Sequence, residues 1–176
     1  MLTQALREQV RQQAHFACEY CGVTETDTAG LLTVDHFQPQ AHGGEHTLDN
    51  LLYCCPRCNL YKADYWSQGA EAPTLWHPKE ENAETHFIEI VNGHLYPLTP
   101  KGTFTVTRLR LNRPQLVAYR LQKREQTEKL RLITRYEAVI SMQEKLSMQQ
   151  SEFLLEQRSL LDELQKVIAL LIHTVQ

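Results

Sequence analysis

Four of the five cysteines form two C-x-x-C pairs, and this pattern constrains the fold more than any other feature of the chain. Cys18 and Cys21 make the first pair, and Cys55 and Cys58 make the second. Together they can supply four sulfur ligands to one tetrahedral zinc ion, with room for a small subdomain between the pairs. The remaining Cys54 is expected to be a packed core thiol, or a ligand if the second pair is displaced by one residue.

The N-terminal segment MLTQALREQVRQQAHF has no apolar run of signal-peptide length, and no stretch of the chain approaches the roughly 20 apolar residues that span a bilayer. We therefore expect a cytoplasmic protein. In that reducing compartment, paired cysteines are typical of metal thiolates rather than of disulfides.

The segment between the two cysteine pairs holds the polar side chains available for chemistry. Asp35 and His36 end a strand-like run, Asn50 precedes an apolar pair, and Asn59 follows the last cysteine directly. Zinc closed by four thiolates has no open position for water, so it is structural. Any catalysis must then come from these other residues.

This segment resembles the HNH endonuclease family, whose ββα-metal motif reads C-x-x-C, D-H-x-x-P, G-G, N-L and C-x-x-C-[HN]-x-x-K. The resemblance covers about 45 residues, roughly a quarter of the chain. The matching positions are Cys18, Cys21, Asp35, His36, Pro39, Gly43, Gly44, Asn50, Leu51, Cys55, Cys58, Asn59 and Lys62.

The resemblance implies a role for each polar residue. His36 would be the general base that activates water, and Asp35 and Asn59 would bind a catalytic Mg²⁺ or Mn²⁺. Asn50 would orient the loop or the His36 ring, and Lys62 would contact a phosphate. DNA rather than RNA is the implied substrate. His42 and His46 are expected at the surface, with contact to substrate or metal as the alternative.

The net charge of -3 hides a strongly basic segment. Between Lys101 and Tyr136 there are ten Lys or Arg against two acids, so this segment carries +8. A local basic stripe is what a phosphate backbone requires, although a solvated basic helix face is the alternative. The residues predicted to contact nucleic acid here are Arg108, Arg110, Arg113 and Arg120.

Residues 67–112 are expected to form a loop-rich extension containing a β-hairpin. FIEIV precedes Asn92-Gly93 and HLYPL follows, and Asn-Gly supplies the two positive φ angles of a tight turn. The stretch from Thr103 to Leu111 is ambiguous between strand and helix.

Residues 113–176 predict a helical arm with Asn112 as N-cap and Pro114 in the first turn. Three rows of residues recur every seven positions along it, which favours coiled-coil association, although a bend or helical hairpin near Gln149–Ser151 is equally compatible. The arm is expected to form a homo-oligomer or to bind a regulatory protein such as an ATPase. The first row is Leu132, Val139, Leu146, Phe153, Leu160 and Val167; the second is Ile133, Ile140, Ser147, Leu154, Leu161 and Ile168; the third is Tyr136, Gln143, Gln150, Gln157, Leu164 and Leu171.

Taken together, the sequence predicts an α+β protein with an HNH nuclease module over residues 1–66, the extension over 67–112 and the arm over 113–176. The predicted function is metal-dependent phosphodiester hydrolysis. A zinc-dependent nucleic-acid-binding module without catalysis is the main alternative, and a coiled-coil scaffold with a zinc adaptor is a third.

Overall fold

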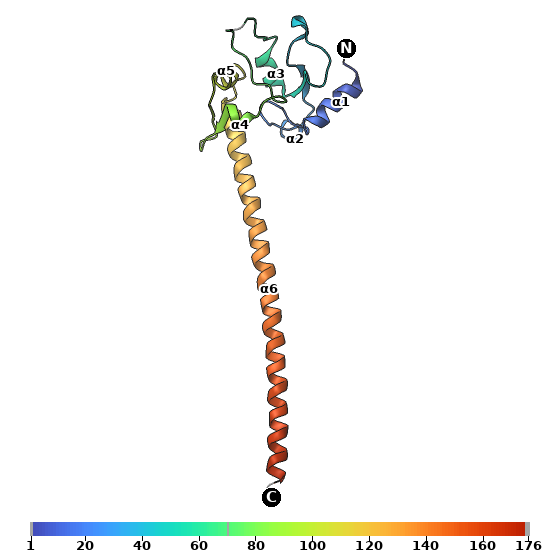
Figure 1. Ribbon diagram of the computed structural model, residues 1–176, viewed down its shortest axis with the longest axis vertical. Coiled ribbons are helices and arrows are strands. Elements are labelled where there is room, and N and C mark those ends of the chain that lie inside the picture. The colour runs from blue at the N-terminus through green and yellow to red at the C-terminus, as the bar shows by residue number, and fades with distance from the viewer. Residues whose placement is uncertain (1, 70, 175–176) are drawn as a thin grey trace. The chain divides into compact units, whose positions relative to one another are not determined.

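The computed structural model describes residues 2–69 and 71–174, and it divides the chain into two compact units, Met1–Lys123 and Arg124–Gln176. The first unit contains short helices and two two-stranded antiparallel sheets, and the second is helical (Figure 1). The predicted α+β class is confirmed. No helix among the described residues is both long enough and apolar enough to cross a membrane.

The centre of the first unit is a ββα arrangement. Strand β1 (Thr33–His36) pairs antiparallel with β2 (Leu51–Cys54), and helix α3 (Pro56–Lys62) follows β2 after a single residue. That residue, Cys55, has an extended backbone and caps the helix, while Pro56 occupies the first turn, where its missing N–H costs nothing. The chain therefore turns from strand to helix at a zinc-binding motif.

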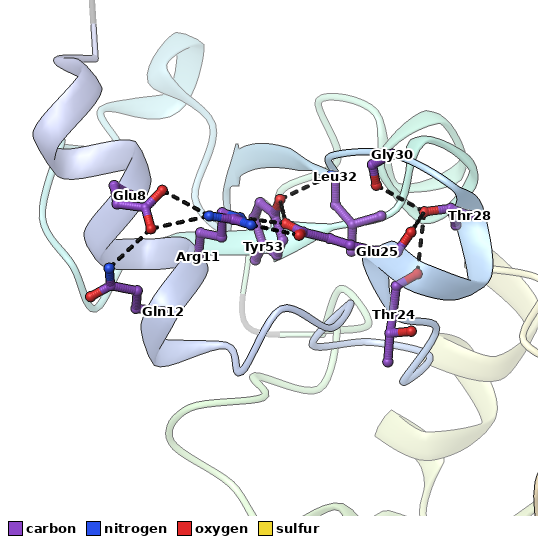
Figure 2. A network of polar contacts seen from close by, with 9 residues as sticks. All are labelled: Glu8, Arg11, Gln12, Thr24, Glu25, Thr28, Gly30, Leu32 and Tyr53. Carbon is purple, nitrogen blue, oxygen red and sulfur yellow. Dashed lines mark hydrogen bonds and ion pairs between the residues drawn. The ribbon is translucent and has the colours of Figure 1, made fainter.

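Two N-terminal helices, α1 (Gln4–Gln13) and α2 (Glu25–Thr28), are joined to each other by an ion pair and to β2 by a hydrogen bond. The Arg11 guanidinium lies between two carboxylates, with Nη1 3.1 Å from Glu8 and Nε 2.6 Å from Glu25 (Figure 2). The hydroxyl of Tyr53 on β2 donates to Glu25 and accepts from the backbone N–H of Leu32 at 2.9 Å. The Glu25 carboxylate on α2 thus connects this helix to α1 and to β2.

The predicted hairpin is present, but its turn differs from the prediction. Helix α4 (Ala83–His86) leads into β3 (Phe87–Glu89), which pairs antiparallel with β4 (Leu95–Pro97). The N–H of Gly93 donates to the carbonyl of Ile90 at 2.9 Å, and of Asn92 and Gly93 only the glycine has a positive φ, at 79°. The turn therefore centres on Val91-Asn92, and Gly93 alone takes the left-handed conformation.

The ambiguous stretch after the hairpin is helical. Helix α5 (Pro100–Arg108) begins with Thr99 as its N-cap, and the side chain of Thr99 accepts from the N–H of Gly102. Thr105 on this helix is fully buried, and its hydroxyl accepts from the N–H of Trp76 at 2.8 Å. Capping and burial outweigh the β-branched residues, which alone favour strand.

Helix α6 (Pro114–Thr174) is a single helix of 61 residues, drawn from yellow to red in Figure 1, so of the two alternatives left open by the sequence the structure has the continuous helix and not the bend or hairpin near Gln149–Ser151. Asn112 does not cap it. Its side chain instead accepts from the N–H of Leu95 at 2.7 Å and donates to the Leu95 carbonyl at 2.8 Å. The Asn112 amide, expected to cap α6, is therefore hydrogen-bonded to the first residue of β4.

Candidate active site and metal centre

The two C-x-x-C pairs meet in the first unit. The Sγ atoms of Cys18, Cys21, Cys55 and Cys58 all lie within 4.8 Å of one another, and those of Cys21 and Cys55 are 3.7 Å apart. Zn–S bonds of about 2.3 Å in a tetrahedron place sulfur atoms about 3.8 Å apart, so the donor set suits structural zinc. Cys54 is buried in the core and does not belong to this cluster.

The backbone shapes both cysteine pairs. In the first pair, the N–H of Gly22 donates to the carbonyl of Cys18 at 2.8 Å, and Gly22 has φ of 73°. In the second pair, the N–H of Cys58 points at Sγ of Cys55, 3.4 Å away. Such N–H groups stabilise thiolates, which are the form that binds metal.

A cation lies against the sulfur cluster. The guanidinium of Arg113 is 3.8 Å from Sγ of both Cys55 and Cys58, and it also donates to the carbonyls of Leu109 and Arg110 at 3.3 Å. Burial alone would lower the pKa of Arg113, but the negative charge of Cys58 and its neighbours raises it. Arg113 therefore offsets the charge of the thiolates as an outer-shell group.

The implied metal ligands, Asp35 and Asn59, lie on the sides of β1 and α3 that face each other. Because side chains alternate along a strand, Thr33 and Asp35 point the same way. The amide nitrogen of Asn59 donates to Oγ1 of Thr33 at 3.2 Å, and one helical turn later Nζ of Lys62 lies 2.9 Å from Oδ2 of Asp35. Since the amide nitrogen of Asn59 is engaged, its oxygen is the atom suited to a metal.

Lys62 does not have the exposure expected of a phosphate contact. It is fully buried, and its ammonium donates to the carbonyl of His36 at 2.6 Å in addition to its ion pair with Asp35. Oδ2 of Asp35 is itself buried and makes no hydrogen bond within the described part of the chain, so it meets Lys62 as an ion pair alone. Lys62 is therefore a buried counter-ion of Asp35 and not a phosphate contact, because the C-terminal end of α3 packs on β1.

His36 is partly exposed, and its ring is held by a second histidine. Nε2 of His36 lies 2.8 Å from Nδ1 of His46, and the ring centroids are 4.9 Å apart. The pKa of His36 is lowered, first by burial and then by the positive charge of His46. His46 is exposed, as the sequence predicted. Its contact with His36 was not predicted, because the conformation of the loop between the two residues brings them together.

Asn50 fixes the loop that carries His46. Its side chain accepts from the N–H of Gln38 at 2.8 Å and donates to the carbonyls of Gln38 and Glu45 at 3.1 and 2.9 Å. Gly44 lies so close to this strand end that an added Cβ would meet the Gln38 carbonyl oxygen at 1.7 Å. These contacts explain why the motif contains an asparagine and a glycine pair.

The four arginines predicted to bind nucleic acid fall into two groups. Arg108 and Arg110 are exposed, and their guanidinium groups lie 5.1 Å from the ring of Tyr65 and 4.8 Å from the ring of Tyr61, respectively. Arg108 also donates to the carbonyl of Lys62 at 3.1 Å. Arg120 and Arg113 are partly buried: Arg120 donates to the carbonyls of Gly93 and Leu111 at 2.6 and 2.9 Å, and Arg113 faces the cysteine sulfurs. Charge counting along the sequence could not separate these internal arginines from the exposed ones.

The comparisons with known proteins agree with this geometry. Residues 18–64 match the family model described as HNH endonuclease, which confirms the resemblance for about a quarter of the chain. No curated protein and no solved structure matches the chain. A match to this family indicates a nuclease or nucleic-acid-binding module.

Proposed function

From the HNH match of residues 18–64, we propose that this protein is an endonuclease that hydrolyses phosphodiester bonds in nucleic acid, with DNA as its substrate. The observation that carries the proposal is the convergence of β1 and α3. Asn59 contacts Thr33, Lys62 contacts Asp35 on the same side of β1, and His36 directly follows Asp35 in the strand, which supports a site at this junction. The proposed compartment is the cytosol.

His36 is the proposed general base. Its lowered pKa keeps the imidazole neutral at physiological pH, which is the form that accepts a proton from water. The contact with His46 orients the ring, and the bond from Lys62 to the His36 carbonyl fixes the backbone at the same residue. We therefore assign positioning roles to His46 and Lys62.

Asp35 and Asn59 would hold the catalytic ion, since carboxylate and amide oxygens suit Mg²⁺ or Mn²⁺. Because Oδ2 of Asp35 is buried against the Lys62 ammonium at 2.9 Å, its other carboxylate oxygen, Oδ1, would be the metal ligand. When bound, the ion would stabilise negative charge on the phosphate and the leaving oxygen. The exposed Arg108 and Arg110 are the proposed phosphate contacts.

The test is cleavage of supercoiled plasmid with Mg²⁺ or Mn²⁺ by the wild type, His36→Ala and the control His94→Ala, all at matched zinc content. Loss of the general base should reduce nicking at least about 100-fold, whereas His94→Ala should cleave normally. If neither wild type nor His36→Ala cleaves while both bind DNA and zinc, the catalytic proposal fails and the non-catalytic binding module replaces it; equal cleavage by both would refute His36 as the general base.

We further propose that a second copy of the chain covers the apolar stripe of residues 124–169. Three rows form it, and their large apolar side chains are each about half exposed. Helical geometry places the row of Gln143, Gln150 and Gln157 between the two apolar rows. Buried amides need partners, and an identical helix offers amides with the same seven-residue spacing, which an unrelated apolar partner would lack.

A further inference from the structure

The face shared by β1 and α3 continues past the implied metal ligands to two aromatic side chains. Phe37 follows Thr33 and Asp35 on this face, and its N–H still donates to the carbonyl of Asn50, so the strand pairing extends to it. Trp66 lies opposite, with its ring centroid 5.9 Å from that of Phe37 and the rings nearly perpendicular. Two residues of strand separate Phe37 from Asp35 by about 7 Å.

These aromatic rings border a cavity of about 340 Å³. Its lining includes the apolar side chains of Phe37, Tyr65, Trp66 and Leu75, together with the carboxylate of Glu80. The volume is at the lower end for small-ligand sites, and an apolar wall with a few polar groups is typical of them. A second hollow of about 380 Å³ shares Phe37, Trp66 and Glu80.

Carboxylates outnumber the one lysine among the described residues that line this cavity, which disfavours phosphate as its ligand. The side chain of Glu80 is 67% exposed. Glu81 pairs at 2.6 Å with Lys101, which also lines the cavity, and at 2.7 Å with His86, so Glu80 is the carboxylate left for a ligand. The second hollow adds Glu45 and Asp49, and the described residues that line it include no Lys or Arg. Carboxylates repel phosphate but accept hydrogen bonds from amino groups.

We infer that the aromatic cavity at Phe37 and Trp66 receives one unstacked nucleobase of the substrate, with Glu80 accepting from an exocyclic amino group. The inference rests on the proposed function, because it places the base beside the Asp35 face. A flat ring gains stacking on aromatic side chains whatever its identity. Adenine, cytosine and guanine carry the amino group, whereas thymine and uracil do not, so the cavity favours the first three.

The test uses ¹⁹F NMR of the full-length, zinc-loaded protein labelled with 5-fluorotryptophan, without Mg²⁺ or Mn²⁺. The chain has two tryptophans, Trp66 and Trp76, and Trp66→Phe assigns their signals. Trp76 is buried and its indole N–H donates to the Glu81 carbonyl, so it reports on the fold. Both probes are deoxyribonucleosides: deoxycytidine, written as cytidine below, should shift the Trp66 signal in a saturable manner, and thymidine should bind roughly tenfold more weakly.

Two variants complete the test. Glu80→Gln should reduce the difference in affinity between cytidine and thymidine. Glu84 does not line the cavity, so Glu84→Gln should leave that difference as in the wild type. Phe37→Leu, which removes a ring but keeps an apolar side chain, should weaken cytidine binding roughly tenfold with the Trp76 signal in place. The absence of a cytidine-dependent Trp66 shift, or equal binding of thymidine, would overturn the inference.

The result is separable from that of the plasmid assay, because no cleavage is involved. Plasmid cleavage without a nucleoside-dependent Trp66 shift would refute the base cavity and leave the nuclease standing. A Trp66 shift specific for cytidine in a protein that does not cleave would support the cavity and refute the nuclease.

Discussion

The ammonium of Lys62 lies 2.9 Å from a carboxylate oxygen of Asp35, and Lys62 is fully buried. A lysine at the end of an amphipathic helix ordinarily extends into solvent, where its charge is hydrated. Here the charge is retained inside the protein because a carboxylate and the carbonyl of His36 replace water. The ion pair therefore binds α3 to β1 at the position of the proposed catalytic residues.

Removing this cation should destabilise the first unit. Lys62→Met keeps most of the side-chain volume but leaves Asp35 in a poorly hydrated position, so the free energy of unfolding should fall by about 3 kcal/mol. In Lys62→Met/Asp35→Asn the loss should be clearly smaller than the sum of the single variants. Urea unfolding measures all three, with the exposed Lys145→Met as control; additive losses would show that the pair is not coupled.

Arg113 should control how tightly zinc is held. Arg113→Met removes the positive charge from Cys55 and Cys58, and removal of an outer-shell partner should reduce zinc affinity roughly tenfold. Competition with a chromophoric chelator measures the affinity. Arg57→Met, which removes an exposed arginine from the same helix as Cys58, is the matched control. Equal zinc affinity of the Arg113 and Arg57 variants would contradict the outer-shell role.

Glu25 should make stability depend on pH in the acidic range. Hydrogen bonds from Arg11, followed by that from Tyr53, lower the pKa of Glu25 to about 2 from an ordinary value of 4.5. A carboxyl group whose pKa is lower in the folded state contributes stability above pH 4.5, and this contribution is lost as the pH falls toward 2. Urea unfolding of Glu25→Gln should therefore approach that of the wild type as the pH falls.

For this comparison, the difference in unfolding free energy between wild type and Glu25→Gln is followed from pH 7 to pH 3.5. Glu152→Gln, on the helical second unit, controls for loss of one negative charge. A difference for Glu25→Gln that stays constant over this range would show that the ion pair contributes nothing through protonation.

The apolar stripe of α6 should cause self-association. Light scattering should find a mass of two chains of 20.4 kDa for the wild type and of one chain for Leu146→Glu/Leu154→Glu. Met148 is equally exposed but lies on the opposite face of the helix, so Met148→Glu should remain a dimer. A wild type that is monomeric at micromolar concentration, with its helix content intact, would exclude the second copy as occupant.

The elements that sequence predicts best depend on local spacing. The cysteine pairs, the hairpin strands and the start of α6 at Pro114 follow from neighbouring residues, and the structure contains them all. The turn at Gly93 and the side chain of Asn112 were misassigned because the register of β4 decides both. Tertiary contacts of this kind have no signature in a single sequence.

In the candidate site too, local spacing predicts which residues are present, and tertiary contacts decide what they touch. The motif located Asp35, His36, Asn50 and Asn59, and the structure gathers them around β1 and its loop. The burial of Lys62 and the contacts of Arg113 could not be read from composition, since a basic residue has the same letter whether it faces phosphate, thiolate or solvent. Only the packing of α3 and the start of α6 separates these cases.

Three successive contacts join β1 and its extension to α3 and the residues after it: Thr33 with Asn59, Asp35 with Lys62, and Phe37 with Trp66. Cys55 and Cys58, two of the four clustered cysteines, lie at the other end of the same segment. An insertion between Cys58 and Trp66 would shift every later partner out of register at once, whereas an insertion in the loop between Gln38 and Asn50 would leave all three contacts in place. Variation in chain length among proteins built this way should accordingly be confined to the loop.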